Sequence, residues 1–112
     1  MNASIRLLAE PVRTLAFGSI VAGYTGIGTG LTNPCRIVFI QNLTDSLLMF
    51  SMDGVDDHFP LPSNGYMILD VTGNSNTNLQ GFYISRGQRF YVKQIGVPTS
   101  GSVYVSAFYG AE

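Results

Sequence analysis

Residues 36–54 carry apolar side chains on both faces of two expected strands, and this feature constrains the fold more than any other. Successive side chains of a strand point to opposite faces, so Ile37 and Phe39 share one face while Val38 and Ile40 share the other. The second run of apolar residues repeats the pattern. One face covers the chain's own core, and a chain of 112 residues has little left to cover the other. The pattern therefore predicts a sheet whose outer face meets a neighbouring subunit.

A short polar bend, Asn42–Asp45, separates the two runs, and Asp53 and Gly54 end the second. Short polar bends between runs of β-branched and aromatic residues are typical of hairpins. We expect a two-stranded hairpin at the centre of the sheet.

Other segments repeat the strand pattern between turns rich in glycine, proline and asparagine. They are residues 11–18, 66–72, 82–85, 88–94 and 102–109. Residues 59–62 hold two prolines, which remove ladder donors and restrict this segment to an edge or a bend. Residues 5–10 form the one plausible helical turn, which Pro11 ends.

The fold class predicted from these segments is all-β: an antiparallel β-sandwich, jelly-roll-like, in a single domain over residues 1–112. Residues 1–33 are expected to include a partly extended N-terminal arm and a glycine-rich segment that loops or extends over residues 19–33. An immunoglobulin-like sandwich is the alternative, although the chain has no tryptophan and only one cysteine.

Charged residues make up 12% of the chain, about half of the usual ~25%. The net charge is −1 and the basic residues are scattered, so no nucleic-acid footprint is present. The apolar run at residues 15–22 is diluted by glycine and serine, and neither a signal peptide nor a membrane span of about 18 residues is expected. An exterior with so few charges favours contact with other chains.

The residues that most often perform chemistry have structural explanations here. Cys35 is expected to be a buried small hydrophobe without a disulfide partner. Gly26–Gly30 is followed by Pro34 and a strand, and not by the helix whose N-terminus a phosphate-binding loop needs. Asp53–His58 lacks the alternating oxygen ligands of a hard-cation loop, which favours an acidic turn, with His58 at a strand entry. We expect no catalytic residue, cofactor or metal.

Five segments together resemble small virion structural proteins of tailed bacteriophages. They are PVRTLAFGSI (11–20), NPCRI (33–37), NLTD (42–45), SMDG (51–54) and GSVYV (101–105). The resemblance implies a capsid decoration or cement protein that clamps neighbouring capsid subunits, or a connector or adaptor ring of the neck or tail. The implied partners are further copies of the chain, the major capsid protein or other virion subunits, in a virion assembled in the host bacterial cytoplasm. Neither group works by chemistry, so no catalytic residue is implied.

The apolar residues expected at such a protein–protein interface come from the N-terminal third and from the second central run. They are Leu7, Leu8, Leu15, Phe17, Ile20, Tyr24, Ile27, Leu48, Phe50 and Met52. A carbohydrate-binding sandwich is an alternative function, in which Tyr24, Tyr66, Tyr83 and the polar loop at residues 74–78 would contact the sugar.

Overall fold

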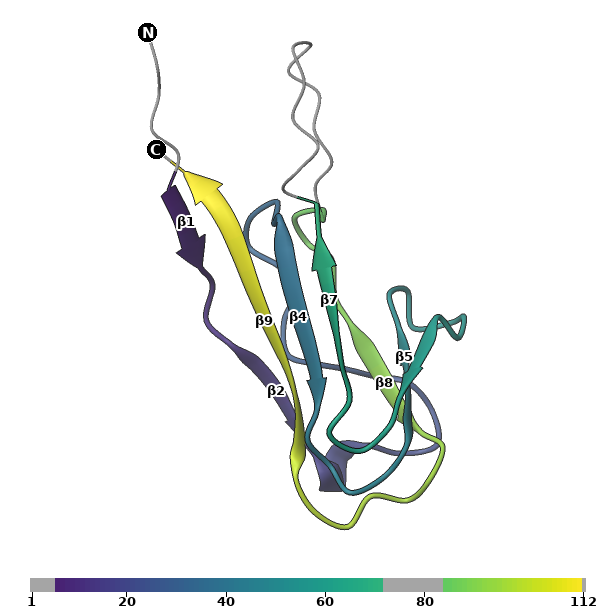
Figure 1. Cartoon of the computed structure of the whole chain (residues 1–112). Helices are drawn as coiled ribbons and strands as arrows, with labels where there is room; N and C mark the ends of the chain where they lie inside the picture. Colours follow the sequence, from purple (N-terminus) through teal and green to yellow (C-terminus); the bar gives the residue numbers. More distant parts are fainter. Residues whose placement is uncertain (1–5, 72–83, 112) are drawn as a thin grey trace, which may run out of the picture.

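Two antiparallel sheets make up the computed structural model, which describes residues 6–71 and 84–111 (Figure 1). The five-stranded sheet contains β1 (Arg6–Ala9), β2 (Arg13–Ala16), β4 (Ile37–Asn42), β7 (Tyr66–Asp70) and β9 (Ser102–Ala111). The four-stranded sheet contains β3 (Thr25–Gly26), β5 (Leu48–Ser51), β6 (Phe59–Leu61) and β8 (Tyr91–Gln94). Within the described ranges the only helix is a 3₁₀ turn, η1 (Phe17–Ser19). The predicted all-β sandwich of antiparallel strands is confirmed.

The strand order places each of the two central runs inside a sheet. In the five-stranded sheet the order is β1-β9-β4-β7, with β2 also paired to β9, so β4 lies between β9 and β7. In the four-stranded sheet the order is β3-β8-β5-β6, so β5 lies between β8 and β6. Every pairing is antiparallel.

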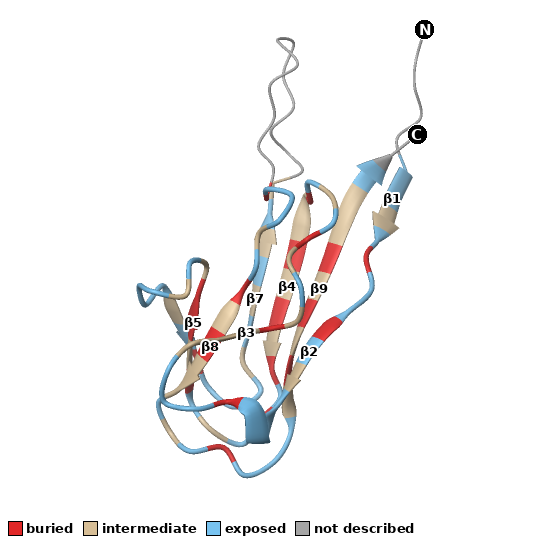
Figure 2. Cartoon of the chain, turned by 180° about the vertical axis from the view of Figure 1, so that it is seen from behind, coloured by how far each residue is buried: buried red, intermediate tan, exposed pale blue. Residues whose placement is uncertain are grey.

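The core lies between the sheets and is built by the period-two alternation of their strands. Figure 2 shows this alternation as buried and half-buried bands along β4 and β9. The fully buried side chains come from both sheets: Val38, Ile40, Leu48, Phe50, Val92, Val103, Val105 and Ala107. Positions 103, 105 and 107 share one side of the last strand, as its alternation indicates, and this is the side that faces the core.

The expected hairpin at residues 36–54 is wrong, because β4 and β5 belong to different sheets. The bend between them carries the chain across the core from one sheet to the other. Asn42, at the end of β4, is completely buried and directs this crossing. Its Nδ2 donates to the carbonyl oxygens of Ser46 at 2.9 Å and Leu61 at 2.9 Å, and its Oδ1 accepts from the Thr44 amide at 3.0 Å. The side chain thus replaces the ladder bonds that a hairpin would make.

We predict that Asn42→Ala lowers the free energy of unfolding by about 2–4 kcal/mol, because buried carbonyl groups lose their donor and the Thr44 hydroxyl loses its acceptor. Urea denaturation measures this change, and Asn64→Gly, in the neighbouring exposed turn whose φ of 65° glycine adopts freely, is the control for a general loss of asparagine. A change below about 1 kcal/mol would show that the crossing does not depend on this amide.

The helical turn expected at residues 5–10 is also wrong in its described part. Residues 6–9 form β1, which pairs with the end of β9 from Arg6 opposite Ala111 to Ala9 opposite Phe108. A single turn of helix has too few hydrogen bonds to be stable in isolation, whereas pairing with β9 gives the backbone partners. The expected strand at residues 11–18 is present as β2, followed by η1.

The glycine-rich segment, residues 19–33, closes over the chain's own core. It loops and extends as expected, and its apolar residues Ile20, Ile27 and Leu31 are buried. A Cβ on Gly30 would lie 2.6 Å from the carbonyl oxygen of Gly87, which no real Cβ contact tolerates. The close backbone approach expected of these glycines is confirmed at this position.

A buried ion pair fixes this segment to the β1–β2 edge. Glu10 and Arg13 are 7% and 8% exposed, and their side chains approach to 2.9 Å. Arg13 also donates to the carbonyl oxygens of Thr29 and Gly30 at 2.8 and 2.9 Å, while Glu10 accepts from the Asn33 amide at 2.7 Å. Burial alone would raise the pKa of Glu10, but these donors, the Thr32 amide and Arg13 together lower it.

We predict that Glu10→Gln lowers the free energy of unfolding at pH 7 by about 3 kcal/mol, because Arg13 stays buried without its counter-charge. The folded-state pKa of Glu10 is below its ordinary value of 4.5, so its contribution is complete above that pH and is lost as pH falls through the folded-state pKa. The stability gap between wild type and variant should therefore narrow on acidification, as measured by urea denaturation at stepped pH values. A gap independent of pH would contradict this account.

The other expected segments divide between confirmed strands and residues outside the described ranges. The proline-containing segment at 59–62 holds β6, an edge strand as expected, and 66–72, 88–94 and 102–109 hold β7, β8 and β9. The expected strand at 82–85 lies partly outside the described residues, and Ile84 forms a bridge to Cys35. Tyr83 and the loop at 74–78 also lie outside them.

Candidate functional site

The outer face of the five-stranded sheet is the most distinctive surface of the described chain. The strand registers place its side chains in three rows that cross the sheet. The rows are Ala9-Phe108-Ile37-Asp70, then Ser106-Phe39-Ile68, then Thr14-Tyr104-Gln41-Tyr66. We call the apolar part of this surface the outer apolar face; it consists of Leu7, Ile37, Phe39, Tyr66, Ile68, Tyr104 and Phe108.

Large side chains on this face remain open to solvent. Leu7, Tyr66 and Ile68 are 57%, 62% and 54% exposed, while Ile37 and Phe39 are half-buried by their neighbours. The rings of Phe39 and Tyr66 meet edge to face, with centroids 5.5 Å apart, which holds the centre of the patch in place. Among the described residues that the registers place on this face, Asp70 alone carries a charge at neutral pH. Contiguous apolar surface of this kind marks interaction sites.

The outer face of the four-stranded sheet, which includes Met49, Tyr91 and Lys93, instead carries polar contacts within the chain around Lys93. Asp57 accepts a hydrogen bond from the Tyr24 hydroxyl at 2.5 Å and pairs with Lys93 at 3.0 Å. The Lys93 ammonium also lies 4.8 Å from the centre of the Tyr24 ring. Burial, followed by the bond to Asp57 and the nearby carboxylates, raises the pKa of Tyr24. The two outer faces of the sandwich are therefore chemically different.

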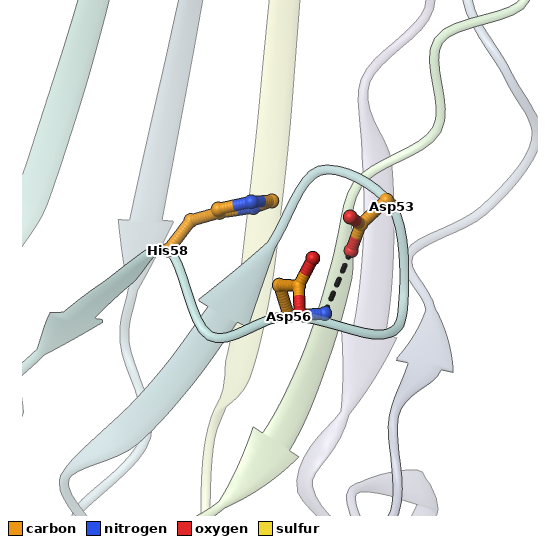
Figure 3. Close-up of side chains that lie close together, drawn as sticks. All are labelled: Asp53, Asp56 and His58. Carbon is orange, nitrogen blue, oxygen red and sulfur yellow. Dashed lines mark hydrogen bonds between the residues drawn. The ribbon is translucent and has the colours of Figure 1, made fainter.

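The acidic turn after β5 brings Asp53, Asp56 and His58 together (Figure 3). Asp53 Oδ1 accepts from the Val55 and Asp56 amides at 2.8 and 2.9 Å, which is an Asx turn, as expected. These amides and the Ser51 hydroxyl lower the pKa of Asp53. His58 Nδ1 accepts from the Met52 amide at 2.9 Å, just before β6, as expected for a strand entry. One ligand atom of each of these three exposed residues lies within 4.8 Å of the other two, so together they could hold a cation.

Cys35 is fully buried, as expected, beside the buried ion pair. Its Sγ lies 3.7 Å from Glu10 Oε2 and 3.3 Å from the carbonyl oxygen of Asn33. Burial, and then the negative charge of Glu10, raises the pKa of this thiol to about 11. The thiolate needed for nucleophilic chemistry is therefore scarce at neutral pH.

We predict that the Cys35 thiol of the folded protein resists a maleimide or a disulfide reagent at pH 8, because it is both buried and protonated. Labelling followed by mass spectrometry should show reaction only after addition of denaturant. Rapid stoichiometric labelling under native conditions would show that the site opens readily.

The structure divides the ten residues expected at an interface into three groups. Ile20, Ile27, Leu48 and Phe50 are buried in the chain's own core and have no side-chain surface for a partner, which corrects their assignment. Leu7 and Phe17 are exposed, whereas Leu8, Leu15, Tyr24 and Met52 are half-buried. Only Leu7 among the ten belongs to the outer apolar face.

The other residues of the outer apolar face were missing from the expected interface. The sequence did contain a signal for these residues, which is the period-two alternation of the strands. Tyr104 and Phe108 alternate with the core residues of β9, and Tyr66 and Ile68 lie on one face of β7. Sequence alone could not show which of the two faces lay inside.

No helix in the described part of the chain is long and apolar enough to cross a membrane. No protein-family model matches the chain, and a search of curated proteins found no match.

Proposed function

We propose that this chain is a non-enzymatic structural protein of a tailed-phage virion, most specifically a capsid decoration or cement protein. In this role the outer apolar face sits on neighbouring capsid subunits and holds them together. The protein acts within the virion, which is assembled in the host bacterial cytoplasm, and its partners are the major capsid protein, other virion subunits or further copies of itself.

The observation that carries the proposal is the contrast between the two outer faces. One has aromatic and aliphatic side chains with a single charged residue among its described positions, and on the other Lys93 pairs with Asp57 and lies over the Tyr24 ring. A sandwich that is solvated on both sides needs no such asymmetry. Charge depletion and an aromatic centre are the features that distinguish the core of a protein interface.

The strand order supports a jelly roll as the finer fold within this proposal. When β1 and β2 are counted as one interrupted strand, eight strands form two sheets of four, in the orders β1/β2-β9-β4-β7 and β3-β8-β5-β6. This interleaving of strands from both halves of the chain is what two nested Greek keys produce, and viral capsid proteins and lectins share it. In the proposed assembly, β1 with its exposed Leu7 is the arm that reaches a neighbour.

Two of the described residues support a non-enzymatic role. The Cys35 thiol is inaccessible, and His58 uses Nδ1 to accept the Met52 amide. The alternative of a carbohydrate-binding module is weakened at Tyr24, because Lys93 covers its ring and Asp57 takes its hydroxyl. Exposed Tyr66 remains available to a sugar, and a glycan array tests that alternative directly.

We predict that Phe108→Glu abolishes attachment of the protein to capsids, because a carboxylate buried at the contact without a partner costs several kcal/mol, or more than about 100-fold in affinity. Purified particles of the encoding phage that lack the chain are mixed with wild-type or variant protein, and occupancy is measured by sedimentation and cryo-electron microscopy. Val97→Glu, at a 70% exposed loop position, is the matched control and should bind like the wild type.

Equal occupancy by Phe108→Glu and wild type would contradict the assigned contact face. Density located at the neck or tail, with the same face engaged, would replace the decoration role by the connector or adaptor role. Circular dichroism and the urea midpoint check that each variant is folded.

A further inference from the structure

Among the described residues, the edge strand β7 differs from the other sheet edges in having neither a proline nor a break within it. β7 ends the order of the five-stranded sheet, and no described strand follows it. Edge strands usually carry proline, lysine or a break that blocks association with another chain. β6 contains Pro60, β3 has two residues, and Pro11 separates β1 from β2, whereas Tyr66–Asp70 is an unbroken five-residue strand.

The hydrogen-bond pattern shows which backbone groups of β7 point outward. The Val71 amide donates to Arg36 at 2.8 Å, and Gly65 accepts from the Asn42 amide at 2.9 Å, so odd-numbered positions of this strand face β4. In an antiparallel ladder successive residues direct their N–H and C=O groups to opposite sides. Tyr66, Ile68 and Asp70 therefore direct these groups toward the open edge, and the same three side chains are exposed.

We propose that two copies of this chain pair through β7, antiparallel and about a two-fold axis at Ile68. Outward-facing residues of the two strands must oppose one another, and centring on Ile68 gives the longest overlap of the two five-residue strands. Tyr66, Ile68 and Asp70 of each copy then exchange about six backbone hydrogen bonds with the partner. The two five-stranded sheets become one continuous sheet.

The side chains suit this register on both faces of the sheet. Ile68 lies opposite Ile68 of the partner subunit, and each Tyr66 lies opposite the partner's Asp70, so the two carboxylates are kept apart. A carboxylate accepts up to about four hydrogen bonds, so a bond from the tyrosine hydroxyl is compatible with the interaction that Asp70 already makes. On the inner face, half-buried Met67 meets the partner's Leu69 next to the core.

This pairing goes beyond the proposed virion role and does not depend on it. It joins two outer apolar faces edge to edge, so the surface presented to a third protein is doubled while the faces themselves stay open. Failure of the edge pairing would leave attachment to a shell through Phe108 and its neighbours untouched.

Disulfide cross-linking of single-cysteine substitutions tests both the edge and the register. Opposed residues in a hydrogen-bonded antiparallel pair have Cα atoms about 5.5 Å apart, within the range of about 4.4 to 6.8 Å that a disulfide spans. The native Cys35 is buried and contributes little background. Under mild oxidation, Ile68→Cys should form a cross-linked dimer at least about tenfold faster than Val97→Cys, because pairing raises the effective concentration of the thiols.

The register has its own test. Tyr66→Cys and Asp70→Cys should cross-link efficiently when mixed with each other and poorly when each is alone. Equal rates for the mixture and the separate proteins, or an Ile68→Cys rate equal to that of Val97→Cys, would overturn the proposal.

Light scattering on the unmodified protein provides the equilibrium measurement. We expect a concentration-dependent dimer whose dissociation constant rises at least about tenfold in Ile68→Lys, because lysine is the residue that natural edges use to prevent pairing. Val97→Lys is the matched control and should leave dimerisation unchanged. A monomer at all concentrations, or equal weakening by both lysine variants, would count against β7 as the contact.

Discussion

The buried amide of Asn42 is the contact on which the two-sheet arrangement depends. The chain leaves the five-stranded sheet at this residue and enters the four-stranded sheet six residues later, at Leu48. Its side chain forms hydrogen bonds with Thr44 and Ser46 in the turn and with Leu61 in β6. It therefore joins the end of β4, the turn and the end of β6. Gly101 lies against the same turn, where a Cβ would clash with the carbonyl oxygen of Leu43. One polar group therefore fixes the corner around which the hydrophobic core is built.

A second polar cluster lies where the glycine-rich segment meets β1 and β2. Glu10 and Arg13 are buried together and bind the backbone of the glycine-rich segment at Thr29, Gly30 and Asn33. A segment with four glycines loses much entropy when it becomes ordered, and apolar anchors alone hold it at few points. The side chains of the ion pair form several hydrogen bonds with the backbone of this segment. Neither of these two polar clusters uses a residue of the outer apolar face.

The sequence predicted the class of the fold and most strand positions, because alternation and turn residues are local signals. It could not predict that β4 and β5 lie in different sheets, since a short polar bend reads the same in a hairpin and in a crossing between sheets. The interface prediction failed at Leu48 and Phe50 for a related reason. When both faces of a strand are apolar, only the pairing partners decide which one is inside, and those partners are distant in sequence. At β1, pairing with distant β9 overrode a local helical pattern.

The pairing of β1 with the end of β9 has a practical consequence. Arg6 lies opposite Ala111, so the two ends of the described chain meet at one corner of the sheet, while β7 occupies the other edge (Figure 1). A peptide or tag fused to either end would emerge from the same place, remote from the strand proposed to join two copies. A short linker between the ends would also permit circular permutation, with new termini opened in the exposed loop near Val97.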